Sequence, residues 1–230
     1  MIGIIGAMAN ETKKLYEMMT DTEVKVIAGM NFQKGKLQGK DVVVVQCGVG
    51  KVNAAVCSQI LCDVYHVDAM INTGIAGSLR NEINIGDIVL STDALHHDMD
   101  ARMFGYKLGQ VPQMDVWEFK ADEHLREIAY SCKDEVDTEI NMFQGRVVSG
   151  DQFIGDHDKK VFLRETFDGF CTEMEGSAIA QTAYLNKVPF LIVRAISDKA
   201  DDNVEIDYPA FEEKAIEHGV RLILAMLRKL

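Results

Sequence analysis

The chain has 230 residues, of which 47% are hydrophobic, so it is long enough to bury one substantial core without a second domain. Its 36 acidic residues outnumber its 24 basic residues and leave a formal net charge of -12. A surface of this charge repels nucleic-acid phosphates and anionic membrane surfaces, which excludes both as expected partners.

Three further features of the composition indicate where the protein works. The five cysteines are scattered without CxxC spacing, in a chain too large to need disulfides. The first residues lack the basic leader and long apolar stretch of a signal peptide. No apolar run approaches the roughly 20 residues that a membrane-spanning helix needs. We therefore expect a cytoplasmic protein with reduced thiols.

Short β-branched segments alternate along the chain with longer segments of helical periodicity. This alternation is typical of an α/β fold in which helices cover both faces of a central sheet. The expected strands cover residues 2–5, 24–28, 32–37, 42–47, 69–72, 87–91, 142–148 and 190–196. The expected helices cover residues 10–19, 51–65, 123–133, 159–167, 176–186 and 209–230. No linker, charge block or repeat interrupts this order, so we expect one domain over residues 1–230.

Three of these segments carry additional information. Residues 42–45 and 190–193 are continuously apolar, as in strands that are buried on both faces near the centre of a sheet. The last expected helix has an apolar stripe, with Ala215, Val220 and Leu227 on it. Residues 96–117 form the least regular stretch, and loops of this length are typically functional or in contact with a partner.

Two motifs invite a ligand-binding interpretation and support it weakly. Gly48 and Gly50 join a strand to a helix, but Asn53 stands where a dinucleotide-binding turn needs its third glycine. We interpret this segment as a tight strand-to-helix turn. His96 and His97 precede two aspartates, yet adjacent residues rarely reach one metal ion, so we expect a polar loop and no metal site.

Three acidic residues lie where strands or segments end and helices begin. Glu11 follows the first strand, Glu175 precedes a helix, and Asp198 comes directly after the last apolar strand. Ligands of open α/β sheets bind outside the carboxyl ends of the strands, so these carboxylates are candidates for one site. The alternative is helix capping, which is worth about 0.3–1 kcal/mol for each residue.

Six strings along the chain resemble those of the methylthioadenosine/S-adenosylhomocysteine nucleosidases, relatives of the purine nucleoside phosphorylases. They are IGIIGAMANE, CGVGKVNAA, INTGIAGSL, VSGDQFI, TEMEG and VRAISD, in the family's order and approximate spacing over nearly the whole chain. The chain departs from the family at Ile75 and Ser78, where the family has serine and glycine. The resemblance implies a nucleoside phosphorylase-like α/β fold with a mixed central β-sheet flanked by helices.

The resemblance also implies a reaction. The enzyme would hydrolyse the N-glycosidic bond of 5′-methylthioadenosine, S-adenosylhomocysteine and 5′-deoxyadenosine, releasing adenine and the 5′-substituted ribose. Asp198 would be the general acid that protonates the leaving adenine, and Glu11 would activate the attacking water. One carboxyl group for the leaving group and one for the water is also the arrangement of inverting glycosidases. The reaction needs no metal or organic cofactor.

By the same resemblance, other residues would bind the substrate. Glu175 would accept hydrogen bonds from the ribose hydroxyls, with Met174 packed against the sugar. Phe153 would stack on the purine and the backbone of Ile154 would contact its edge. Gly77 would let the backbone approach the ligand closely, since it has no Cβ.

Two further pairs of residues complete the expected site. Arg194 and Ser197 would position the acid or shape the pocket. Phe104 and Pro112 would come from a neighbouring subunit and cover the 5′ substituent, so the resemblance implies a homodimer. The irregular stretch has four large apolar residues that would form an exposed patch on a free monomer, which fits an interface: Met103, Phe104, Met114 and Trp117.

Three alternatives remain at this point. A phosphorylase on the same scaffold would use phosphate as the nucleophile, but Glu11 would repel that anion. A nucleosidase for a futalosine-type nucleoside would share most of these residues and differ around the 5′ group. A nucleoside-binding protein without catalysis would not need both an acid and a water-activating base.

Overall fold

Ten strands join in one mixed β-sheet in the computed structural model, which describes residues 1–201 and 204–230. The strands are β1 (Ile2–Gly6), β2 (Thr20–Ile27), β3 (Met30–Leu37), β4 (Lys40–Gln46), β5 (Ala69–Ser78), β6 (Ile88–His96), β7 (Phe119–Lys120), β8 (Met142–Ser149), β9 (Gly169–Glu173) and β10 (Phe190–Asp198). Their order is β10-β6-β8-β9-β5-β1-β4-β3-β2, with β7 on β6. Because β10 also pairs with β5, five of the strands close into a ring.

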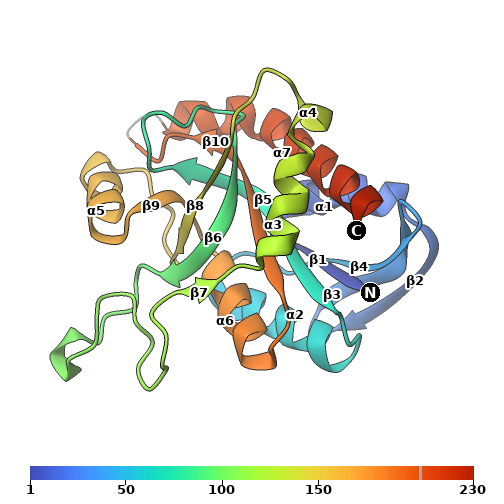
Figure 1. The fold of residues 1–230 in the computed structure, drawn as a ribbon, viewed down its shortest axis with the longest axis horizontal. Coiled ribbons are helices and arrows are strands. Elements are labelled where there is room, and N and C mark those ends of the chain that lie inside the picture. Colours follow the sequence, from blue (N-terminus) through green and yellow to red (C-terminus); the bar gives the residue numbers. More distant parts are fainter. Residues whose placement is uncertain (202–203) are drawn as a thin grey trace.

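Helices cover both sides of this sheet. They are α1 (Ala9–Met18), α2 (Lys51–Asp63), α3 (Glu123–Ser131), α4 (Lys133–Val136), α5 (His157–Phe167), α6 (Gly176–Asn186) and α7 (Val204–Lys229), with a short 3-10 helix at Arg102–Phe104. Helix α7 packs on β10 and β5, whereas α2 and α6 pack on each other on the opposite side (Figure 1). The predicted α/β class, with a central sheet flanked by helices, is confirmed.

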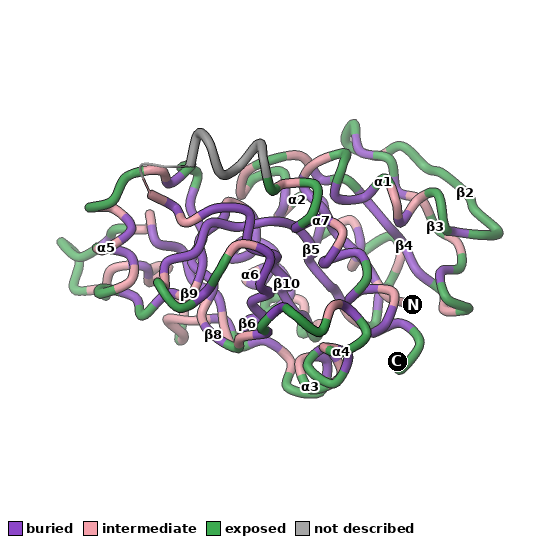
Figure 2. The backbone as a smooth tube through the Cα atoms, turned by 90° about the horizontal axis from the view of Figure 1, so that it is seen from above, coloured by how far each residue is buried: buried purple, intermediate pink, exposed green. Residues whose placement is uncertain are grey.

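The apolar segments of the sequence fold as their patterns predict. All four valines of residues 42–45 are fully buried in β4, and the first residues of β10 are buried on both faces as well. On α7, Ala215, Val220 and Leu227 of the predicted stripe are buried against the sheet. Buried segments run through the middle of the molecule, while β2 and most turns are exposed (Figure 2).

The prediction was wrong or incomplete in several segments. Strand β9 was not predicted, because it is five residues long and is completed by pairing with β8 and β5. The helix predicted over residues 123–133 ends at Ser131, and Cys132 separates it from α4. Strands β5, β6 and β10 extend beyond the predicted runs, and the extensions of β5 and β10 carry residues of the pocket described below.

The long connection between β6 and β7 is less exposed than its sequence indicates. Met103 and Phe104 are 97% and 84% exposed, as expected of a patch. Met114, however, packs against the main core, and the Trp117 indole donates a hydrogen bond to Leu108 and lies under the Arg146 guanidinium. The predicted apolar patch is therefore wrong for Met114 and Trp117.

Candidate active site

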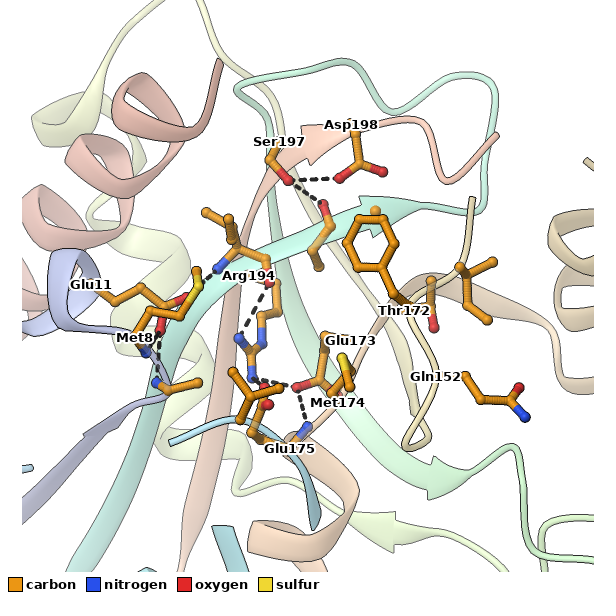
Figure 3. A pocket seen from close by; sticks show the side chains of 17 residues that line it. Met8, Glu11, Gln152, Thr172, Glu173, Met174, Glu175, Arg194, Ser197 and Asp198 are labelled. Carbon is orange, nitrogen blue, oxygen red and sulfur yellow. Dashed lines mark hydrogen bonds and ion pairs between the residues drawn. The ribbon is translucent and has the colours of Figure 1, made fainter. Parts of the chain in front are cut away.

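A pocket lies at the carboxyl ends of β1, β5 and β10, which run parallel to one another, and beside the end of β9. Figure 3 shows its polar side chains arriving from separate elements and pointing toward a common space. The pocket is lined by most of the predicted site residues: Glu11, Gly77, Phe153, Ile154, Met174, Glu175, Arg194, Ser197 and Asp198.

Glu11 is the third residue of α1, and its carboxylate reaches back over the start of the helix. Its Oε2 accepts the backbone N–H groups of Ala7 at 2.7 Å and Met8 at 2.9 Å, and its Oε1 accepts that of Ile75 at 3.1 Å. The side chain is 3% exposed, and burial raises the pKa of Glu11 despite the nearby Arg194 charge. Glu11 therefore caps its helix and also presents a carboxylate to the pocket.

Asp198 is the last residue of β10 and is 3% exposed. Its Oδ1 accepts the backbone N–H of Ala200 at 2.8 Å, and its Oδ2 accepts the Ser197 hydroxyl at 2.8 Å. Gly77 is its register partner on β5. The structure thus holds the Asp198 carboxylate at a fixed position on the pocket wall, with Ser197 oriented toward it.

Glu175 precedes α6 and lies between a glycine turn and an arginine. Its Oε1 accepts the backbone N–H of Gly50 at 2.9 Å, and its Oε2 is 3.6 Å from Nη2 of Arg194. Gly48 and Gly50 have φ angles of +86° and +97°, which only glycine adopts readily. The turn is tight, as predicted, and the anion that its backbone binds is a carboxylate of the same chain.

Arg194 is the centre of the charged groups in this pocket. Its guanidinium is almost fully buried and pairs with Glu173, while Nη2 also donates to Asn72 Oδ1 at 2.5 Å. The negative charges around it raise its pKa, although burial acts in the opposite direction. A Cβ at position 74 of β5 would overlap Arg194 Nη1 and Glu11 Oε1, so Gly74 gives both side chains the space they occupy.

Glu173, Asn72 and Gly74 were not predicted as site residues. Glu173 lies in the TEMEG string, two residues before Glu175, which was the glutamate of that string predicted to bind the ribose. Asn72 is the last residue of a predicted strand, and an amide at such a position could have indicated a buried polar network. Gly74 lies inside strand β5, and glycine in a strand interior indicates a close approach of other groups.

Apolar side chains form the remaining wall of the pocket. Ile154 is buried and belongs to a small second core cluster, and Met174 is partly buried. The Phe153 ring is 62% exposed. Ile75, at a position where the sequence departs from the family pattern, lines the pocket and contributes its backbone N–H to Glu11.

Phe104 and Pro112 do not line the pocket of their own chain. Both belong to the connection between β6 and β7, which projects from the body of the molecule (Figure 1). The Phe104 side chain is exposed and Pro112 is partly buried. The structure of one chain therefore separates these two residues from the other predicted site residues.

The paired histidines have different surroundings. His96 Nδ1 lies 2.7 Å from the Ser177 hydroxyl and Nε2 lies 2.8 Å from Gln181 Oε1, so both ring nitrogens are occupied by protein groups. His97 is buried, and burial lowers its pKa to about 4. Over residues 1–201 and the described side chains of α7, no three His, Cys, Asp or Glu groups are placed to hold a metal ion. In the same part of the chain, no helix is long and apolar enough to span a membrane.

Known proteins of one superfamily match this chain over its full length or nearly so. A family model described as "Phosphorylase superfamily" matches residues 1–228. The 5′-methylthioadenosine/S-adenosylhomocysteine nucleosidase of Staphylococcus carnosus (strain TM300) is 42% identical over 231 residues, covering 100% of both chains. The crystal structure of the nucleosidase of that name from Neisseria meningitidis, in complex with methylthio-immucillin-A, has a TM-score of 0.95 at 35% identity. It covers 100% of this chain and 99% of that one.

A relative that is named for a different activity is also similar. The native structure of futalosine hydrolase from Helicobacter pylori strain 26695 has a TM-score of 0.94 at 30% identity and covers 100% of this chain and 97% of that chain. Both kinds of relative share the fold to the same degree, so the fold does not distinguish between their substrates.

Proposed function

This chain belongs to the methylthioadenosine/S-adenosylhomocysteine nucleosidase family of the phosphorylase superfamily, and from this we propose that it hydrolyses the N-glycosidic bond of 5′-methylthioadenosine and S-adenosylhomocysteine. 5′-Deoxyadenosine, which has the same base and ribose diol, would be a further substrate. The observation that carries the proposal is the presence of two buried carboxylates, Glu11 and Asp198, on different sides of one pocket (Figure 3).

Asp198 is the general acid in this proposal. An adenine that leaves with a negative charge is a poor leaving group, so protonation of its imidazole ring lowers the barrier to bond cleavage. The hydrogen bonds from Ser197 and from the backbone of Ala200 fix the direction of the Asp198 carboxyl group. Its position at the end of β10 lets it meet the base at one side of the pocket.

Glu11 binds and deprotonates the attacking water. Its carboxylate is held by three backbone N–H groups, so it is positioned before the substrate arrives. Burial raises the pKa of Glu11, which makes its ionised form a stronger base than an exposed carboxylate. The water attacks the sugar carbon from the face opposite to the leaving base, as in inverting glycosidases.

Glu175 binds the ribose diol and Met174 packs against the sugar. A carboxylate has two oxygens that accept hydrogen bonds, which suits a pair of neighbouring hydroxyl groups. One oxygen of Glu175 accepts the N–H of Gly50, so the side chain is held in place while its other oxygen faces Arg194. Phe153 and the backbone of Ile154 contact the base.

Phe104 and Pro112 of a second subunit cover the 5′ substituent in a homodimer. The Phe104 ring is exposed in its own chain, and burial of such a ring is favourable by about 1.5–3 kcal/mol. The apolar residues Val52 and Val56 on α2 are exposed as well and offer further surface for such an interface.

The charge of the pocket disfavours the phosphorylase alternative. Among the described residues that line the pocket, Arg194 is the one cationic side chain, and Glu173 already pairs with it. A phosphate ion would also meet the carboxylates of Glu11 and Glu175, whose repulsion in a buried site is large. Water carries no charge and meets no such repulsion.

Adenine release from 5′-methylthioadenosine in phosphate-free buffer tests the proposal. Free methylthioribose is expected without phosphate, at a rate that added phosphate leaves unchanged. Turnover that requires phosphate would contradict the assignment of Glu11 to water. S-adenosylhomocysteine and futalosine are tested in parallel, and a kcat/KM higher for futalosine than for both adenine nucleosides would contradict the proposed substrate class.

A further inference from the structure

Glu173 lines the pocket but has no part in the proposed chemistry, and its carboxylate accepts hydrogen bonds from four donors. Its Oε2 accepts the backbone N–H groups of Glu175 at 3.1 Å and Gly176 at 2.8 Å, together with Nη2 of Arg194. Its Oε1 accepts the Ser149 hydroxyl. A carboxylate can accept about four such bonds, so both oxygens of Glu173 are bound by groups of the protein.

The groups behind Glu173 are fixed as well. Ser149 Oγ accepts the backbone N–H of Ser177 at 2.7 Å, and the Ser177 hydroxyl contacts Nδ1 of His96 at 2.7 Å. Nε2 of His96 contacts Gln181. The network therefore ties Glu173 to β8, α6 and β6, and in such a buried network each polar group depends on its neighbours.

Arg194 has two carboxylates within reach but contacts them unequally. Its Nη2 is hydrogen-bonded to Glu173 and to Asn72, whereas Oε2 of Glu175 stays 3.6 Å from it. That distance is longer than a hydrogen bond. Among the described residues, no donor binds Oε2 of Glu175, which is thus the acceptor left for a ligand.

We propose that Glu173 is a positioning residue: it binds Arg194 away from Glu175 and anchors the turn that carries Glu175, so that one oxygen of Glu175 stays available for the ribose diol. Without the charge of Glu173, Arg194 would close on Glu175 and occupy that oxygen. This inference rests on the proposed function, because it assigns the diol to Glu175. Glu173 itself touches no reacting atom.

The electrostatics of Glu175 agree with this arrangement. Burial first, and then the charge of Glu173, raise the pKa of Glu175 to about 7, while Arg194 and the Gly50 N–H lower it. Glu11 of α1 also faces it and raises its pKa, and the nearby thiol of Cys47 stays neutral because burial raises its pKa to about 12. Removing the Glu173 charge would therefore lower the pKa of Glu175.

The test compares wild-type protein and Glu173→Gln on 5′-methylthioadenosine and on its 2′-deoxy and 3′-deoxy analogues. Gln keeps the shape of the side chain and removes its charge. We expect KM for 5′-methylthioadenosine to rise about tenfold, which corresponds to the loss of one charged hydrogen bond to the substrate. The change in kcat should be smaller. The deoxy analogues lack a hydroxyl that Glu175 binds, so the substitution raises their KM less. The acidic limb of the kcat/KM profile moves to lower pH.

Asp87→Asn is the matched control, because Asp87 is also a buried carboxylate that accepts two backbone N–H groups, from Asn84 and Asn141, but lies outside the pocket. We expect Asp87→Asn to lower the free energy of unfolding. The ratios of KM between 5′-methylthioadenosine and its deoxy analogues should stay as in the wild-type protein. Ser149→Ala keeps the charge of Glu173 and removes one bond to it, so it should shift KM in the same direction by less. This variant serves as the test if Glu173→Gln does not fold.

Two results are distinguishable. If wild-type protein releases no adenine from 5′-methylthioadenosine, the proposed function fails. If wild-type protein is active and the folded Glu173→Gln variant loses the same factor on all three nucleosides, with an unshifted pH profile, Glu173 has only a structural role and the inference is overturned. An equal loss in Ser149→Ala on all three substrates would overturn it in the same way.

Discussion

Gly77 and Asp198 are register partners on β5 and β10, and a Cβ at Gly77 would lie 2.7 Å from Oδ1 of Asp198. It would also lie 2.8 Å from Cβ of Ala200, whose N–H binds the same oxygen. These distances are shorter than van der Waals contact. The absence of a side chain at position 77 therefore makes room for the proposed acid, in addition to any close approach of a ligand.

Gly77→Ala is expected to displace the Asp198 carboxyl group and to lower kcat by about 100-fold, the cost of a misplacement near 1 Å. Adenine release measures kcat, and thermal unfolding shows whether the variant is folded. Gly219→Ala on α7 is the control, because among the described residues its Cβ would meet only Thr73 Oγ1, at 3.3 Å. A folded Gly77→Ala protein with wild-type kcat would contradict the spatial argument.

Asp198→Asn removes the proton that the acid donates and keeps the shape of the side chain. We expect kcat to fall by about 10²–10⁴-fold, the usual contribution of general acid catalysis, with little change in the Kd of 5′-methylthioadenosine. Calorimetry gives Kd and a single-turnover experiment gives the rate. Ser197→Ala removes one donor to Asp198 and should cost much less. Full activity of Asp198→Asn would exclude the acid role.

Activity should fall at acidic pH because two carboxylates must be ionised. The pKa of Glu175 is raised to about 7, mainly by burial, and burial raises the pKa of Glu11 in the same direction. A carboxylic acid is protonated below its pKa, so Glu175 loses acceptor capacity and Glu11 loses basicity as the pH falls. We expect kcat/KM to fall by at least about tenfold per pH unit below about pH 7. A flat profile between about pH 5 and pH 8 would contradict the assignment.

The apolar patterns of the sequence predicted the central strands of this fold, because an uninterrupted apolar run indicates a strand that is buried on both faces. The runs at residues 42–45 and 190–193 were predicted as buried strands and are buried in β4 and β10. Strand β9 escaped prediction, since its pairing with β8 and β5 joins residues far apart in the sequence. Periodicity within five residues cannot report such long-range pairing.

For the pocket, the resemblance indicated which residues come together, but the pairing of charges required the structure. Glu11, Glu175 and Asp198 were each compatible with simple helix capping. Glu173 and Asn72 were missed because their importance comes from Arg194, which reaches them across the sheet. Similarly, Trp117 looked like part of an exposed patch because the side chain that covers it, Arg146, is 29 positions away in the sequence and lies on strand β8.

Mixing two impaired variants tests whether Phe104 acts in the pocket of a neighbouring subunit. Phe104→Ala is expected to raise KM for 5′-methylthioadenosine by roughly tenfold or more through lost apolar contact. It should not lower the stability of the single chain, because the ring is 84% exposed there. Asp198→Asn is inactive for a different reason, loss of the acid. In a mixed dimer, one pocket combines Asp198 of the first variant with Phe104 of the second and is intact.

At substrate concentrations well below the KM of the Phe104→Ala variant, the mixture should therefore release adenine faster than the sum of the two proteins measured separately. Gentle unfolding and refolding together allows the subunits to exchange, and the unmixed variants treated in the same way are the control. Mixing Asp198→Asn with Glu11→Gln is the second control, because Glu11 and Asp198 line one pocket of the same chain. In that mixed dimer one pocket lacks Glu11 and the other lacks Asp198, so no activity is expected to be restored. If mixing Glu11→Gln with Asp198→Asn restored activity, these two carboxylates would act across the interface. If mixing Phe104→Ala with Asp198→Asn gave no gain in activity, Phe104 would lie outside the partner's pocket.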